Sequence, residues 1–306
     1  MQPVSNPDNP AVLPKIRIVM VRTSHPGNIG SAARAMKTMG LTQLYLVNPA
    51  DLSDIKMAIS TGQGKAHALA SGATDVLQQA TLCQTLDEAL QGCTLVIGAS
   101  ARLRTIQWPQ LNPTACAGHL LAQAGEGADV ALLVGNEQSG LDNSELDHCH
   151  YLTHIEANPD YTSLNVAMAV QVFCWEIRKA WLAMSKADDN LPEARLTEGN
   201  RSEPVPTNTD EALGEALASH EEVERFLEHL RYTMIDIGFL GPTKQNKQLL
   251  RRLRRLFNRA RLGVREVNIL RGILSAAQGH KSAQLPDKSK ASRVEAGETD
   301  QASPNQ

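Results

Sequence analysis

The stretch NPDYTSLNVAMAVQ, residues 158–171, places hydroxyl and amide side chains directly in front of an apolar run. That run continues with helical spacing, so we expect a long buried helix over residues 164–184. Ser163 is a good N-cap for this helix, because its hydroxyl can accept a hydrogen bond from a backbone N–H. A cap does not explain Asn165, whose amide lies among apolar neighbours. A binding site at the start of the helix is therefore the second interpretation.

Short apolar strands alternate with helical segments on the N-terminal side of this stretch. This alternation predicts an α/β fold with a mostly parallel sheet, buried on both faces. The expected strands lie at 16–21, 44–47, 94–100, 129–135 and 151–155, and the expected helices near 31–39, 85–92 and 113–124.

The composition sets outer limits on the class of protein. Hydrophobic residues make up 42% and charged residues 21% of 306, which is typical of a globular chain. Aromatic residues make up only 4%, so stacking of bases on aromatic side chains is not expected to dominate nucleic-acid binding. No apolar run is long enough to predict a membrane span. The five cysteines form no C-x-x-C pair, which argues against a disulfide framework or zinc site and favours the reducing cytoplasm.

The net charge of the chain is only −3, but charged residues are unevenly distributed along the sequence. Residues 186–224 hold three basic and eleven acidic residues, a net of −8, whereas residues 244–265 hold nine basic and no acidic residues. The basic segment predicts either a helix that binds a polyanion or a solvated amphipathic helix packed on its own domain. We expect disordered tails at 1–14 and 279–306, an α/β domain at 15–185, an acidic flexible linker at 186–210 and a helical basic extension at 211–278.

Two further segments join the opening stretch as candidate sites. SHPGNIGSAARAMK (24–37) follows a strand and contains Asn28 and Arg34, and LLVGNEQSGLDNSEL (132–146) ends a strand at Gly135 before Glu137. Ligands bind at such strand ends in open α/β sheets, although neither segment carries the usual NAD or ATP signature. The alternatives are a glycine-rich turn for the first segment and, for the second, a solvated glutamate, with Asp142 or Asn143 capping the next helix. The histidines lack metal-ligand spacing, so no metal is expected.

In this order and spacing, the three segments resemble the motifs of the SpoU branch of the SPOUT methyltransferases. The nearest type within that branch methylates ribose 2′-hydroxyls in the tRNA anticodon loop, and the matching stretches include SARLRT (100–105), LRRLFNRAR and EVNILRGIL. The resemblance covers roughly residues 15–276. It implies a C-terminal deep trefoil knot, S-adenosylmethionine as cofactor, tRNA as partner and a homodimer in which two subunits complete each active site, with the helix from about Leu164 at the interface.

Carried onto this chain, the resemblance implies three sets of site residues. The catalytic set is Arg34, Asn28, Glu137, Ser163 and Asn165. The cofactor-binding set is Ala99, Ser100, Ala101, Gly135, Asn136, Glu137, Gly140, Ile155, Ala157, Ser163, Leu164 and Asn165. The RNA-binding set is Arg34, Arg102, Arg104, Lys244, Lys247, Arg251, Arg252, Arg254, Arg255, Arg259 and Arg261.

Two positions depart from the pattern of this type, and one role is open. Many such chains have arginine where Asn136 stands, and an acidic residue is expected where Arg22 stands. Family accounts treat Arg34 as a base, but guanidinium pKa values exceed about 12. We therefore expect Arg34 to bind the adjacent phosphate and orient the 2′-hydroxyl. The resemblance implies modification of nucleotide 32, C or U; the alternatives are an rRNA 2′-O-methyltransferase and a non-catalytic RNA-binding protein on the same fold.

Overall fold

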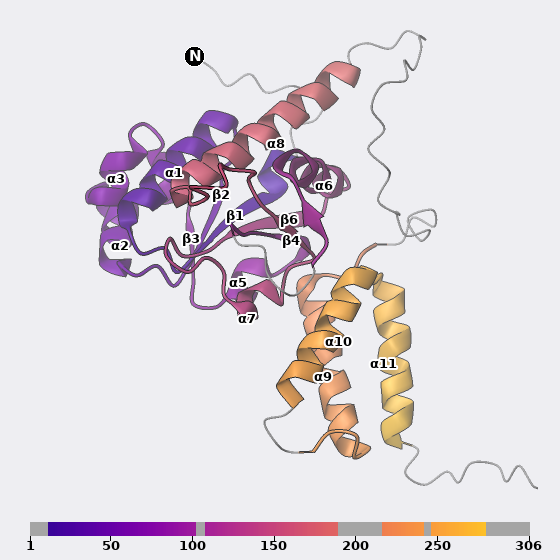
Figure 1. Cartoon of the computed structure of the whole chain (residues 1–306). Coiled ribbons are helices and arrows are strands. Elements are labelled where there is room, and N and C mark those ends of the chain that lie inside the picture. Colours follow the sequence, from indigo (N-terminus) through magenta and orange to yellow (C-terminus); the bar gives the residue numbers. More distant parts are fainter. Residues whose placement is uncertain (1–11, 102–107, 189–215, 242–245, 280–306) are drawn as a thin grey trace, which may run out of the picture.

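A seven-stranded sheet forms the centre of the N-terminal domain in the computed structural model, which describes residues 12–101, 108–188, 216–241 and 246–279 (Figure 1). All six strand pairs are parallel, in the order β3-β2-β1-β6-β4-β7-β5. This confirms the α/β class. The strands are β1 (Ile16–Val21), β2 (Gln43–Val47), β3 (Thr81–Cys83), β4 (Cys93–Ala99), β5 (Gln110–Leu111), β6 (Asp129–Val134) and β7 (Tyr151–Thr153).

Both faces of the sheet are buried, because alternate side chains of each strand point to opposite faces. In β1, Ile16, Ile18 and Met20 join one apolar cluster, whereas Val19 and Val21 join the other. The first cluster is covered by α1 (Pro26–Met39), α2 (Leu52–Thr61), α3 (Lys65–Ala70), α4 (Thr74–Gln78), α6 (Pro113–Gly125) and α8 (Val166–Asp188). The second is covered by α5 (Leu86–Leu90) and α7 (Asn143–Leu146). Among the described residues, no helix is long and apolar enough to cross a membrane.

Helix α8 begins at Val166, two residues later than expected, and its cap is Asn165 and not Ser163. The side-chain oxygen of Asn165 accepts hydrogen bonds from the backbone N–H groups of Ala167 (2.9 Å) and Met168 (3.4 Å). An Asn side chain satisfies the unpaired amides of a first helical turn as well as serine does. The expectation of a Ser163 cap was therefore wrong, and Ser163 is an exposed residue ahead of the helix.

The region between β2 and β3 contains α2 (Leu52–Thr61), α3 and α4, none of which the apolar pattern predicted. Asp54, on α2, holds two of these short helices together by accepting hydrogen bonds from the backbone of Lys65 (2.8 Å) and Ala66 (3.0 Å). These bonds tie the start of α3 to α2. Helices this short depend on tertiary contacts of that kind.

Three helices form the C-terminal domain: α9 (His220–Asp236), α10 (Asn246–Ala260) and α11 (Val264–Gly279). Their small core contains Phe226, which meets Phe257 edge-on at 4.7 Å between ring centroids. The apolar face of α10, the basic helix, is only partly covered, since Leu256 is 49% exposed and the buried residue of this helix is Asn258.

The C-terminal domain docks against the N-terminal domain through several polar contacts. The carboxylate of Asp147 accepts two hydrogen bonds from the Arg251 side chain (2.5 and 3.0 Å). The backbone carbonyl of Asp147 accepts a further hydrogen bond from the side-chain amide of Asn258. His220 bonds to Asp87 at 2.8 Å. Burial lowers the pKa of the neighbouring His148 to about 4. The groups around His148 are Asp87, His220, Glu224 and Arg254.

The trefoil knot stays a prediction. Whether the chain is knotted depends on the path of every connection, and the link from β4 to β5 includes residues 102–107, which lie outside the described part of the chain.

Candidate functional site

Three loops meet at the carboxyl-end edge of the sheet. The loops that follow β6, β4 and β7 belong to three neighbouring strands, in that order. The backbone N–H of Ser100, after β4, donates to the carbonyl of Thr153 at the end of β7 (2.9 Å). The loops containing residues 99–101, 135–141 and 155–165 therefore start from adjacent strand ends, at the edge where open α/β sheets bind ligands.

Glu137 is the centre of this edge and not a solvated surface carboxylate. One of its oxygens accepts hydrogen bonds from the backbone N–H (2.8 Å) and the hydroxyl (2.7 Å) of Ser24, and the other accepts from the His25 N–H (3.2 Å) and the Asn28 side-chain amide (2.8 Å). Burial raises the pKa of Glu137, but these hydrogen bonds outweigh that effect and hold the pKa at about 2. Glu137 is therefore an anion at neutral pH, and it ties the loop after β6 to the start of α1.

Asn28 and Asn165 continue this network toward α8. Asn28, in the first turn of α1, donates to Glu137, and its side-chain oxygen accepts from the amide of Asn165 at 3.0 Å. Asn165 in turn caps α8. Three of the five predicted catalytic residues thus form one hydrogen-bonded row that links the loop after β6 with the starts of α1 and α8.

Arg22 and Asn136 fix the loop after β6 to the end of β1. Arg22 makes two hydrogen bonds to Glu145 (2.7 and 2.9 Å) and lies 3.4 Å from Asp142. The hydrogen bond to Glu145 raises the pKa of Arg22. The amide of Asn136 donates to the Arg22 carbonyl at 2.7 Å. Arg22 and Asn136, the two residues that depart from the family pattern, therefore both make hydrogen bonds in this structure.

The loop 135–141 requires its glycines and its cap. A Cβ on Gly135 would lie 2.2 Å from backbone atoms of Gly140 and Leu141, and Gly140 has φ of +67°. Asp142 caps α7 with Glu145 in a reciprocal capping box, which confirms one of the two alternatives for that position.

Arg34 does not join the Glu137 network within this subunit. It lies six residues after Asn28 on α1, which is about 9 Å along the axis and about 240° around it. Its side chain is exposed and forms no hydrogen bond or ion pair with a described residue. The exposed Ser163 likewise makes no side-chain contact of this kind.

The other predicted residues fall into clear groups. Ala99, Ile155 and Ala157 are half-buried, and Ala101 and Leu164 are exposed, all at the edge described above. Arg102, Arg104 and Lys244 lie outside the described residues. On α10 and just after it, Arg251 and Arg254 pair with Asp147 and Glu224, Arg261 contacts Gln123, and Lys247, Arg252 and Arg259 are exposed. The sequence reasoning missed Ser24, His25 and Glu145, because their roles depend on partners more than 100 residues away.

Comparison with known proteins defines the class of this fold and site. Residues 15–175 match the SpoU rRNA Methylase family, and the chain belongs to that family of methyltransferases. More particularly, residues 221–288 match the model described as tRNA methyltransferase TrmJ, C-terminal domain.

All five cysteines are buried free thiols.

Individual relatives resemble the chain over most of its length. The tRNA (cytidine/uridine-2'-O-)-methyltransferase TrmJ of Pectobacterium atrosepticum is 48% identical over 267 residues, covering 87% of this chain and 98% of the relative. The tRNA (cytidine/uridine/adenosine-2'-O-)-methyltransferase TrmJ of Pseudomonas aeruginosa is 45% identical, with coverage of 87% and 95%. The crystal structure of TrmJ from Z. mobilis ZM4 superposes with a TM-score of 0.67 at 29% identity, covering 85% of this chain and 97% of that one.

Proposed function

We propose that this protein transfers a methyl group from S-adenosylmethionine to a ribose 2′-hydroxyl in the anticodon loop of tRNA, at nucleotide 32, C or U. The observation that carries the proposal is the row Glu137–Asn28–Asn165 at the edge where the loops after β6, β4 and β7 meet. Relatives that cover nearly their whole length and are named as tRNA 2′-O-methyltransferases support the reaction and the substrate.

The residues at this edge suit an adenosine-bearing cofactor. Small side chains leave the loop backbone accessible, so its N–H and C=O groups can recognise the polar edges of a base and ribose. These small residues are Ala99, Ser100, Ala101, Gly140, Ala157 and Ser163. When bound, S-adenosylmethionine supplies a methyl group on a sulfonium that the ribose oxygen displaces.

The protein contributes position and electrostatics to this displacement. The ribose oxygen must lose its proton as the new bond forms, and Arg34 is too weak a base to take it at neutral pH. Arg34 instead binds the phosphate next to the reacting ribose, orients the hydroxyl and stabilises the oxygen as negative charge develops. The Glu137 row holds the loops to which the cofactor binds.

A second subunit completes the site. Arg34 lies away from the Glu137 row of its own subunit, so a homodimer can bring it to the row of the partner. Helix α8 carries exposed apolar residues at a spacing of seven: Met168 (62% exposed), Trp175 (51%) and Leu182 (37%). Its opposite face packs into the core through Val170 and Phe173. The exposed row supplies the apolar surface that subunit contact needs.

Arg34→Lys tests the role given to Arg34. The substitution keeps the charge and removes the planar fork that can hold a phosphate through two hydrogen bonds. We expect turnover to fall by about 10²- to 10³-fold while binding of S-adenosylmethionine, measured by calorimetry, stays within twofold. Near-normal turnover would contradict a two-pronged phosphate contact.

Mass-spectrometric mapping of 2′-O-methyl groups tests the whole proposal. RNA from cells with and without the gene should differ at tRNA nucleotide 32, and the purified protein should restore the modification only when S-adenosylmethionine is added. Differences confined to rRNA would indicate an rRNA methyltransferase. Failure to bind S-adenosylmethionine and an unchanged methylation map would together indicate a non-catalytic RNA-binding protein.

A further inference from the structure

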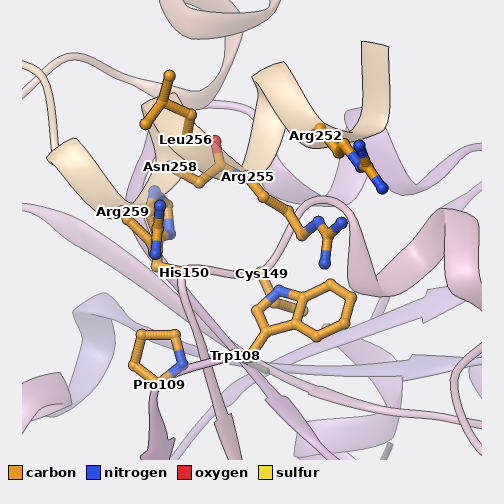
Figure 2. A pocket seen from close by; sticks show the side chains of 9 residues that line it. All are labelled: Trp108, Pro109, Cys149, His150, Arg252, Arg255, Leu256, Asn258 and Arg259. Carbon is orange, nitrogen blue, oxygen red and sulfur yellow. The ribbon is translucent and has the colours of Figure 1, made fainter. Parts of the chain in front are cut away.

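A second recess lies between α10 and the amino ends of β5 and β7. Its volume is about 270 Å³, and Figure 2 shows α10 above it with Trp108 and Pro109 below. Trp108 and Pro109 precede β5, and His150 precedes β7, so the sheet contributes the amino ends of its strands. The cofactor loops proposed above follow the carboxyl ends of β6, β4 and β7.

The arginines of α10 divide into two groups with different surroundings. Arg251 and Arg254 are neutralised by Asp147 and Glu224 and hold the helix in place. Arg252, Arg255 and Arg259 line the recess, and none of them has a carboxylate partner among the described residues. These three positions follow one another at helical spacing, so one face of α10 presents three unneutralised guanidinium groups.

The recess also holds buried donors that lack an acceptor. The guanidinium of Arg255 lies over the Trp108 ring, 5.2 Å from its centroid, and its side chain reaches toward the indole (Figure 2). The Nε of Arg255 and the indole Nε1 of Trp108 are both buried, and neither donates to an acceptor in the described part of the chain. Trp108 itself is only 6% exposed. Both groups can only donate hydrogen bonds, so a ligand that complements them is a hydrogen-bond acceptor with negative charge.

The geometry points to a binding pocket for a phosphate group at Arg252, Arg255, Arg259 and Trp108, which we propose takes a backbone phosphate of tRNA. This inference rests on the proposed function for the identity of the polyanion. A phosphodiester supplies unprotonated oxygens for the two buried donors and a charge for the three guanidiniums. Because no residue of the loops 99–101, 135–141 and 155–165 lines the pocket, it positions the tRNA without touching the reacting ribose.

Binding measurements on the full-length protein test the pocket independently of methylation. Arg255→Gln should weaken tRNA binding about tenfold in fluorescence anisotropy and reduce the slope of log affinity against log salt concentration by about 1. The matched control is Arg271→Gln on α11, an exposed arginine away from the pocket, which should change affinity less than twofold. Thermal unfolding of both variants must match the unmodified protein. Equal effects of the two substitutions on tRNA affinity would overturn the proposal.

Trp108 provides a direct reporter of occupancy. With Trp175 and Trp181 replaced by phenylalanine, Trp108 is the remaining tryptophan of the three in the chain. Its emission should change on addition of tRNA, and Arg252→Gln with Arg259→Gln should weaken that response. A response to millimolar inorganic phosphate but none to tRNA would show a small-anion site and refute the tRNA assignment. Loss of methylation with this response intact would instead count against the proposed function alone.

Discussion

Replacing Glu137 by glutamine keeps the shape of the side chain and removes its charge. One carboxylate oxygen becomes an NH₂ group, which then faces either the two donors of Ser24 or those of His25 and Asn28. The shift of the Glu137 pKa from 4.5 to about 2 corresponds to about 3.4 kcal/mol as an upper limit, at about 1.36 kcal/mol per pKa unit. Solvent reaches part of this side chain and screens its interactions, so we expect a loss of about 1.5–2 kcal/mol in the free energy of unfolding at pH 7.

Urea and thermal unfolding followed by circular dichroism measure this loss. A decrease of this size should lower Tm by about 3–8 °C in a domain of this length. Because the folded-state pKa of Glu137 is depressed, its stabilisation is complete above its ordinary pKa of 4.5 and is lost as the pH falls toward 2. The difference between the unmodified protein and Glu137→Gln should therefore be smaller at pH 3 than at pH 7.

Glu228→Gln is the matched control, since Glu228 is exposed on α9 and makes no hydrogen bond or ion pair with a described residue. This variant should unfold like the unmodified protein at both pH values. The reasoning is refuted if the two glutamine variants are equally stable at pH 7, or if the deficit of Glu137→Gln stays constant down to pH 3.

Three further predictions concern other parts of the molecule. Gly135→Ala should cost about 2–3 kcal/mol in chemical unfolding because its Cβ would overlap the backbone of Gly140, and a smaller cost than for Gly140→Ala would contradict this. Met168→Glu should convert the expected dimer to monomers in analytical ultracentrifugation without changing the circular dichroism spectrum, since this side chain is 62% exposed; an unchanged dimer would place the interface elsewhere. The depressed pKa of His148 means that stability is complete above pH 6.5 and declines as the pH falls to about 4, and His148→Gln should flatten this part of a urea-midpoint titration.

The strands and the carboxyl-end edge of the sheet could be predicted from the sequence, because buried parallel strands are apolar on both faces. The expected segment 16–21 is β1, and 129–135 contains β6. Since parallel strands share one carboxyl edge, the pattern also brought Glu137 and the segment around Asn165 to the same side of the sheet. The helices between residues 52 and 78 were not predicted from the sequence. Helices this short depend on tertiary contacts such as those of Asp54, and not on their own apolar periodicity.

The hydrogen-bond and ion-pair partners of individual polar residues could not be predicted from the sequence, for a different reason. A glutamate at a strand end has the same local sequence whether it is solvated or accepts four hydrogen bonds, and the donors to Glu137 are 109 to 113 residues away. The arginines of α10 pose the same problem. Neighbours in the sequence, Arg254 and Arg255, differ in role only because one meets Glu224 and the other lies over Trp108.

The row Glu137–Asn28–Asn165 has a direction. A deprotonated carboxylate can only accept, so Asn28 must turn its NH₂ toward Glu137 and its oxygen toward Asn165. Asn165 must then turn its NH₂ toward that oxygen and its own oxygen toward the first turn of α8. Neither amide can flip without losing bonds at both of its ends, so one negative charge dictates which atoms both asparagines present. A molecule approaching this edge of the sheet therefore always meets the same sequence of donors and acceptors.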